Sequence, residues 1–275
     1  MNPHKAPRCS LAWLLKSLWQ NRALTYKMVK REVLGRYQGS AMGLLWSFFN
    51  PLLMLAVYTF VFSVVFKARW AGGSDSKTEF ALVLFAGLMI FNLFSECINK
   101  APSLILSNVN YVKKVIFPLE ILPVVALGFA VFHFLISLGV WLIFYFIFFG
   151  LPPITIFQLP LIALPLLFLT LGFSWFLASL GVFLRDVTQI IVVITSVLMF
   201  LSPVFYPLSA LPQEYQNALH FSPLTLLIEQ TRDVMLWGKA VNWAAWSVMC
   251  GASILIAWLG FAWFQKTRKG FADVL

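Results

Sequence analysis

The chain alternates between long apolar runs without charge and short polar segments. Six runs approach or exceed the length that a helix needs to cross a bilayer, about 20 residues. They cover residues 41–66, 80–95, 121–149, 154–184, 187–208 and 240–264. Because apolar residues follow one another instead of alternating with polar ones, the pattern favours helices over barrel strands. We therefore predict an all-α membrane protein with six transmembrane helices.

Two features of these runs refine the prediction. The run at 80–95 is short for a span, so we expect it to extend to Ile98, which places Glu96 near a membrane edge. The runs at 121–149 and 154–184 exceed the bilayer thickness, so tilt or kinks are expected there. All six spans are assigned to one domain, residues 1–275, which comprises an interfacial segment (1–40), the six-span region (41–264) and a tail (265–275).

Composition indicates that lipid is the solvent for much of the surface. Hydrophobic residues make up 61% of the chain, and the mean hydropathy is +0.87. Both values lie outside the range of soluble domains. Membrane lipid is therefore the first expected partner.

The net charge of +10 is concentrated on one side of the predicted membrane. Basic residues on that side are Lys5, Arg8, Lys16, Arg22, Lys27, Lys30, Arg31, Arg36, Lys100, Lys113, Lys114, Arg185, Lys266, Arg268 and Lys269. Those on the other side are Lys67, Arg69, Lys77, Arg232 and Lys239. Because short cytoplasmic loops are enriched in Lys and Arg, we predict that both termini are cytoplasmic. This distribution favours anionic headgroups and a cytoplasmic partner over nucleic acid.

The segment before the first run has a helical pattern. Leucine and tryptophan recur at helical spacing with polar residues between them, at Leu11, Leu14, Leu15, Leu18 and Trp19. A second basic stretch follows at 24–37. We predict interfacial helices over 11–37, with their apolar face in the acyl boundary and their cations at the headgroups. The alternative is a disordered basic tail.

A short basic segment at 110–123, NYVKKVIFPLEILP, lies between uncharged runs. Two adjacent cations, Lys113 and Lys114, stand among aromatic and branched residues, which suits the docking of a cytoplasmic partner. The alternative is an anchor that only orients the protein in the membrane. The residues predicted to form the docking face are Asn110, Tyr111, Lys113, Lys114, Phe117 and Glu120.

The segment at 202–238, on the predicted outer side, is broken by several prolines. Between them lie two amphipathic pieces, near 213–220 and 224–236. We predict short helices that dip into the outer leaflet without crossing it and that gate a pathway. The alternative is a surface lid without a gating role. Candidate gate residues are Pro203, Tyr206, Pro223, Glu229 and Arg232.

No pattern typical of catalysis is present. The sequence lacks a GxxxxGK[ST] phosphate loop, an HExxH motif, a GxSxG motif and paired carboxylates within a span. Cys9, Cys97 and Cys250 are too widely spaced for a metal site. His133 is expected to bond a neighbouring helix, because its own span offers no carboxylate for a proton relay. We predict no enzyme activity, cofactor or metal in this chain.

Taken in order, four segments resemble a known family. They are KREVLGRYQGSAMGLLWSFFNPLLMLAVYTFVF (30–62), NYVKKVIFPLEILP (110–123), FLRDV (183–187) and SPLTLLIEQTRDVML (222–236). Together they resemble the membrane subunit, or permease, of type-2 ABC exporters, particularly those that move polysaccharides. One departure is Ser222 before Pro223, where many relatives carry Asn.

The resemblance implies a homodimer of permeases in a bacterial inner membrane. Two ATP-binding subunits from a separate gene would bind ATP and Mg, and 110–123 would be the coupling segment that docks on them. The cargo would be a glycan such as O-antigen, capsule or teichoic acid, often carried on a lipid.

The first run agrees with a glycan cargo. Aromatic and amide residues fall on one helical face, and aromatic faces stack on sugars without a deep polar site. The residues assigned to this substrate path are Trp46, Phe49, Asn50 and Phe60. Ordinary helix packing is the alternative for this face. For the protein, the alternatives are an exporter of a small hydrophobic drug, antibiotic or haem-like molecule, a membrane glycosyl- or acyltransferase, and a channel or structural protein without ATP.

Overall fold

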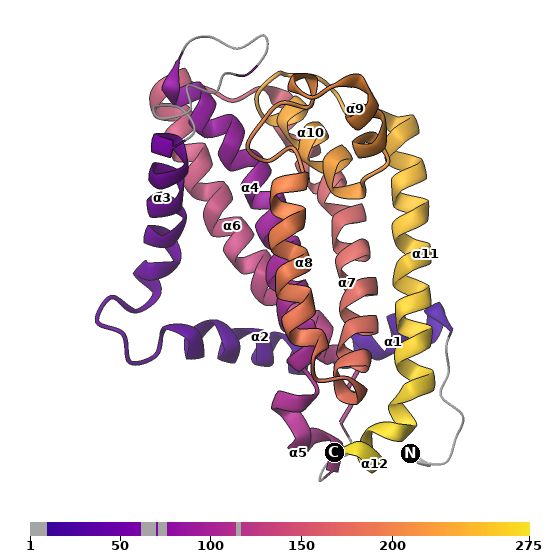
Figure 1. Ribbon diagram of the computed structural model, residues 1–275. Helices are drawn as coiled ribbons and strands as arrows, with labels where there is room; N and C mark the ends of the chain where they lie inside the picture. The colour runs from indigo at the N-terminus through magenta and orange to yellow at the C-terminus, as the bar shows by residue number, and fades with distance from the viewer. Residues whose placement is uncertain (1–9, 62–69, 71–75, 114–116) are drawn as a thin grey trace.

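The computed structural model describes residues 10–61, 70, 76–113 and 117–275. Every regular element in this part of the chain is a helix, which confirms the predicted all-α class. The helices form an upright bundle with shorter helices at both ends (Figure 1).

Four long helices form most of the bundle. They are α4 (Lys77–Lys100), α6 (Ile121–Phe149), α7 (Leu159–Phe183) and α11 (Trp243–Thr267). With the helical turns that adjoin them, four segments of the described chain are long and apolar enough to cross a membrane. These segments are Lys77–Ser103, Ile121–Phe149, Ile154–Phe183 and Trp243–Val274. Four of the predicted spans therefore have a helix of full length at the expected place.

Two shorter apolar helices, α3 (Trp46–Thr59) and α8 (Val187–Leu201), run alongside the long ones (Figure 1). The helix α8 is shorter than the apolar run at 187–208, because the backbone becomes extended at Ser202. Pro203 follows, and a proline disfavours helical backbone at the residue before it. Residues 62–66 of the first predicted span lie outside the described residues.

Short helices cover the two ends of the bundle (Figure 1). At one end, called the α5 end, lie α1 (Leu11–Gln20), α2 (Arg22–Tyr37), α5 (Val109–Lys113) and α12 (Phe271–Val274). At the other, called the α10 end, lie α9 (Gln213–His220) and α10 (Pro223–Met235). The predicted helices at 11–37 and in the proline-broken segment are confirmed, and α2 lies across the bundle rather than along it.

The helix α4 stands at the centre and packs against α3, α6, α7, α8 and α10. Apolar residues occur on all of its sides, which is the pattern of a helix buried within a protein. Val83, Leu84, Ala86 and Ile90 have no exposed surface. This central position lets α4 contribute side chains to sites at both ends of the bundle.

Glycines bring α7 and α11 into backbone contact. A Cβ atom at Gly260 would overlap the carbonyl oxygen of Gly172, and one at Gly172 would overlap the backbone at Ile256. Small residues allow this close approach between membrane helices, where packing replaces the hydrophobic effect as the force for association.

We predict that Gly260→Ala lowers the free energy of unfolding by about 1–3 kcal/mol, because the added methyl group forces the two backbones apart. Gly251→Ala is the matched control on the same helix, since a Cβ there meets no atom within 4 Å. Unfolding of purified protein in mixed micelles, followed by circular dichroism during SDS titration, measures the difference. Equal stability of the two variants would contradict the close contact.

Candidate functional site

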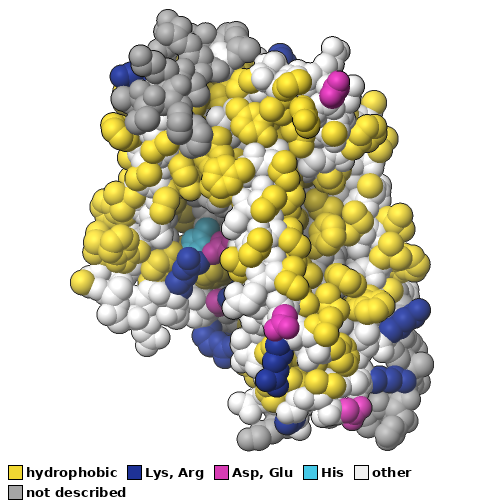
Figure 2. Space-filling model, viewed as in Figure 1, with side chains coloured by type: hydrophobic (Ala, Val, Ile, Leu, Met, Phe, Trp, Pro, Cys, Tyr) yellow, Lys and Arg dark blue, Asp and Glu magenta, His cyan; other side chains and the backbone are white. Residues whose placement is uncertain are grey.

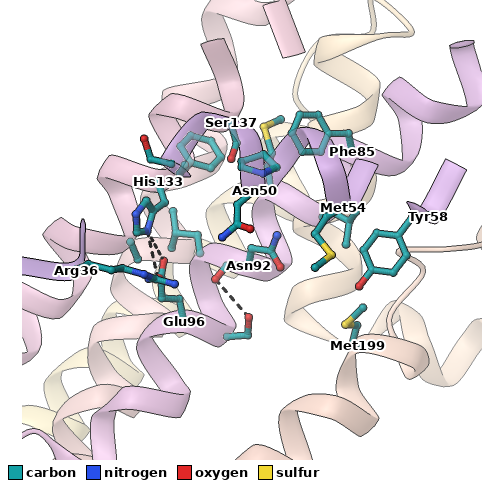
Figure 3. Close-up of a pocket in the computed structure, with 18 of the residues that line it drawn as sticks. Arg36, Asn50, Met54, Tyr58, Phe85, Asn92, Glu96, His133, Ser137 and Met199 are labelled. Carbon is teal, nitrogen blue, oxygen red and sulfur yellow. Dashed lines mark hydrogen bonds and ion pairs between the residues drawn. The ribbon is translucent and has the colours of Figure 1, made fainter. Parts of the chain in front are cut away.

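A cavity of about 380 Å³ opens between α3, α4, α6 and α8, and we call it the central cleft. Side chains that line it include Asn50 and Met54 of α3, Asn92 and Glu96 of α4, His133 of α6 and Met199 of α8 (Figure 3). Figure 2 shows the corresponding hollow, in which histidine, acidic and basic side chains gather on an otherwise apolar face. Ionisable side chains that face the interior of a membrane bundle are a common mark of a functional site.

Four side chains from three helices join at the floor of the cleft, and Figure 3 labels three of them, Arg36, Glu96 and His133. The Glu96 carboxylate accepts a hydrogen bond from Nη1 of Arg36 at 2.6 Å and lies 3.1 Å from Nδ1 of His133. Nε2 of His133 lies 2.8 Å from the Tyr37 hydroxyl. We call this cluster, Arg36, Tyr37, Glu96 and His133, the polar floor. It ties α2 to α4 and α6.

The hydrogen bonds of the polar floor form a consistent chain. An imidazole tautomer with its proton on Nδ1 can donate to Glu96 and accept from the Tyr37 hydroxyl at Nε2. Burial raises the pKa of Tyr37, the nearby Glu96 carboxylate adds to the rise, and Arg36 opposes it. The phenol therefore keeps its proton at neutral pH and remains the donor.

Glu96 is the carboxylate partner of His133, and the sequence analysis did not pair these two residues. The expected bond from His133 to a neighbouring helix is present, and the neighbour supplies the carboxylate that the histidine's own span lacks. The sequence did offer a signal for this pair, an acid at the edge of one apolar run and a histidine in the next. Consecutive helices usually pack together, so side chains of the two runs can meet.

A second hollow, of about 670 Å³, lies between α2 and α4 and shares Arg36 and Glu96 with the central cleft. On its wall Lys100 pairs with Glu32 of α2, and the Lys100 ammonium lies over the Phe129 ring. The two hollows meet at the polar floor.

The predicted substrate residues on α3 separate into two groups. Asn50 lines the central cleft (Figure 3). Trp46, Phe49 and Phe60 do not line it; their side chains are exposed by 37%, 38% and 60%. These three aromatic residues are therefore not part of the core of the single chain.

The predicted docking face is built around α5. The Tyr111 ring stacks on Phe117 with centroids 4.3 Å apart, and its hydroxyl accepts a hydrogen bond from Arg31 at 3.2 Å. The Lys113 ammonium contacts the backbone carbonyl of Leu275. Asn110 is exposed beside them, and Lys114 lies outside the described residues.

Glu120, also predicted for the docking face, is 1% exposed. Its carboxylate accepts hydrogen bonds from Ser17 of α1 and from Nη1 of Arg268, each at 2.8 Å. Nη2 of Arg268 donates to the Phe117 carbonyl at 2.9 Å. Glu120 therefore supports the docking segment from within and fixes it to α1 and the C-terminal segment. It presents no surface to a partner.

Two of the predicted gate residues, Pro203 and Glu229, contact a third, Arg232, which is 1% exposed. Its guanidinium donates to the carbonyls of Val83, Pro203 and Val204 at 3.1, 2.5 and 2.8 Å. It also pairs with Glu229 at 2.9 Å. Burial lowers the pKa of Arg232 to about 10, with Glu229 offsetting part of the shift, so the charge persists at neutral pH.

The remaining gate residues shape the same region. The Tyr206 hydroxyl donates to the Leu201 carbonyl at 2.9 Å and thereby closes the turn after α8. Pro223 occupies the first turn of α10, where its missing N–H costs nothing. Gly87 of α4 leaves room for the Arg232 side chain, since a Cβ there would lie 2.6 Å from Nη2. Arg232 thus anchors the end of the bundle.

Comparison with known protein families gives a match that covers the elements described above. The family described as ABC-2 type transporter matches residues 23–236, from α2 through the docking segment to α10. The chain belongs to the ABC-2 type transporter family. This match spans most of the chain and includes the central cleft, the docking face and the Arg232 anchor.

Curated relatives of this ABC-2 transporter chain align along nearly their whole length. An O-antigen export system permease protein RfbA from Myxococcus xanthus is 27% identical over 262 residues, covering 94% of this chain and 98% of the relative. A protein of the same name from Klebsiella pneumoniae is 24% identical over 249 residues, covering 90% and 93%. The polysialic acid transport protein KpsM from Escherichia coli is 22% identical over 247 residues, covering 87% and 91%.

We predict that Arg232→Met lowers the free energy of unfolding by about 3–5 kcal/mol, because three buried carbonyls and Glu229 lose their partner. Lys239→Met is the control, since the Lys239–Asp233 pair is exposed and its loss should change stability by less than about 1 kcal/mol. The same SDS titration measures both. A small effect at Arg232 would contradict an anchoring role.

Proposed function

We propose that this chain is the transmembrane subunit of an ATP-driven exporter that moves a polysaccharide, carried on a lipid, across a bacterial inner membrane. The observation that carries the proposal is end-to-end similarity to permeases named for O-antigen export and polysialic acid transport, which covers 94% and 87% of this chain. Similarity of this extent includes the spans and both ends of the bundle. It is more than a shared motif.

In this proposal α3 and α8 are the first and fifth of six spans. At 1.5 Å per residue each spans about 20 Å, less than the 30 Å of the hydrocarbon core. The segment after α8, held by Tyr206 and Arg232, would complete the outer leaflet, with α9 and α10 as re-entrant helices. The α5 end would face the cytoplasm together with both termini, in agreement with the distribution of Lys and Arg.

The docking face around α5 would receive the ATP-binding subunit, which binds ATP and Mg. Its support is rigid: Tyr111 stacks on Phe117, and Glu120 and Arg268 join the segment to α1 and the C-terminal segment. A docking element must be held firmly if a movement of the partner is to reach the spans.

A second copy of the permease would cover the apolar surface that α3 and α8 leave open. Exposed residues of this surface include Leu53, Val57, Val193, Val197 and Phe200. Trp46 and Phe49 on α3, and Phe60 directly after it, are exposed and thus free to line a glycan path between the copies. Two permeases and two ATP-binding subunits would form the complete exporter.

We predict that Trp46→Ala combined with Phe49→Ala reduces the polysaccharide displayed on cells lacking the native gene, while the amount of folded permease stays unchanged. The reason is that exposed aromatic faces contribute sugar stacking and little to the chain's own core. Trp243→Ala with Phe221→Ala, two exposed aromatics at the α10 end, should leave display normal. If display and permease level fall together, the residues pack the protein and do not contact the glycan. Normal display in cells lacking the gene altogether would contradict the proposed function.

We predict that Lys113→Glu combined with Lys114→Glu weakens co-purification of the ATP-binding subunit, and more strongly at low ionic strength, where screening is least. The control is Lys77→Glu with Lys239→Glu, which reverses two charges at the α10 end. Cysteine accessibility at position 110 reports whether the altered protein is correctly inserted. Full co-purification and normal export in a correctly inserted variant would contradict docking at α5.

A further inference from the structure

The central cleft contains polar side chains whose hydrogen-bonding capacity is not used within the chain. The amides of Asn50 on α3 and Asn92 on α4 face into it (Figure 3). Neither amide has a hydrogen-bond partner among the described residues. Both side chains are exposed within the single chain, and each amide offers two donors and an acceptor to a ligand in the cleft. A ligand that both donates and accepts would satisfy them.

The charges of the cleft are already compensated. Arg36 pairs with Glu96, and Lys100 pairs with Glu32. A phosphate group would have to displace these carboxylates or lie against them, and like charges in a medium of low dielectric repel strongly. The site therefore suits an uncharged ligand rich in hydroxyl groups better than an anion.

The opposite side of the cleft is lined by aromatic rings and flexible methionine side chains. Met54, Tyr58, Phe85 and Met199 line it (Figure 3). Aromatic rings and thioethers pack well on the C–H faces of sugars, and methionine adapts to differing shapes. The cavity, about 380 Å³, lies at the small end of the usual range for ligand pockets, about 300–1,000 Å³. Its size suits a short stretch of glycan.

We propose that the central cleft binds an uncharged sugar ring of the exported glycan, with Asn50, Asn92 and the Glu96 carboxylate contacting its hydroxyls. This inference rests on the proposed function and names the part of the cargo that the chain recognises. The second hollow provides the approach, because it meets the cleft at Arg36 and Glu96 from the α5 end. A sugar close to the lipid carrier would enter by this route before the rest of the chain follows.

Thiol protection tests binding directly. Asn92→Cys permease, assembled with its ATP-binding subunit in nanodiscs, is labelled with a maleimide in the presence of decyl maltoside or decyl phosphate. These probes share an alkyl chain and differ in the head group. Decyl maltoside should slow labelling in a saturable way, by about tenfold at ten times its dissociation constant, while decyl phosphate gives little protection. Unsubstituted protein sets the background, which includes any labelling at Cys9; Cys97 and Cys250 are buried.

Asn217→Cys on α9, an exposed asparagine outside the cleft, is the matched control and should be protected by neither probe. Several results would overturn the sugar site. They are no protection by decyl maltoside, equal protection at position 217, stronger protection by decyl phosphate, and a thiol at position 92 that does not react even without a probe.

A transport measurement separates this inference from the proposed function. Asn50→Leu and Asn92→Leu should each raise the glycan concentration for half-maximal export about two- to tenfold, the effect of one lost hydrogen bond. The Asn217→Leu control, on the exposed face of α9, should leave the half-saturating concentration unchanged. Unchanged half-saturation in both cleft variants would overturn the sugar site and leave glycan export standing. Absence of glycan export by the unaltered complex would instead refute the proposed function.

Discussion

The contact between the Arg232 guanidinium and the carbonyls of Val83, Pro203 and Val204 fixes the α10 end of the bundle. It illustrates a constraint that governs the whole structure: a charge removed from water must find partners inside the protein. Glu96 meets the same demand with Arg36 and His133. The Arg232 contacts join α10 to α4 and to the segment after α8, and the Glu96 contacts join α4 to α2 and α6.

The helix α4 connects these contacts. Its Val83 carbonyl and the space at Gly87 receive Arg232, while Asn92, Glu96 and Lys100 follow at intervals of four residues along one side. Residues four apart lie above one another on a helix. The anchor at the α10 end, the central cleft and the contact with α2 therefore share one rigid element. A movement of α2 at the α5 end would reach α4 through the Arg36–Glu96 and Glu32–Lys100 pairs.

Local patterns in the sequence predicted the helices well and the contacts between them poorly. The amphipathic piece near 213–220 became α9 at the same bounds, because proline and periodicity act over a few residues. The partner of Glu120 is Arg268, which lies 148 residues away, and no local pattern encodes such a pair. The Glu96–His133 contact joins consecutive long helices, but the pattern of each run does not show which of its faces meets the other. The run at 187–208 overestimated α8, since hydrophobicity alone does not register the break that Pro203 imposes.

Reconstitution tests the central claim, glycan export, most directly. The permease and its ATP-binding subunit are incorporated into proteoliposomes with either a lipid-linked polysaccharide or a small hydrophobic dye outside. We expect ATP-dependent accumulation of the polysaccharide in the lumen, with both subunits required and no accumulation of the dye. Accumulation of the dye without movement of the polysaccharide would contradict glycan export and identify the chain as part of an exporter of small hydrophobic molecules.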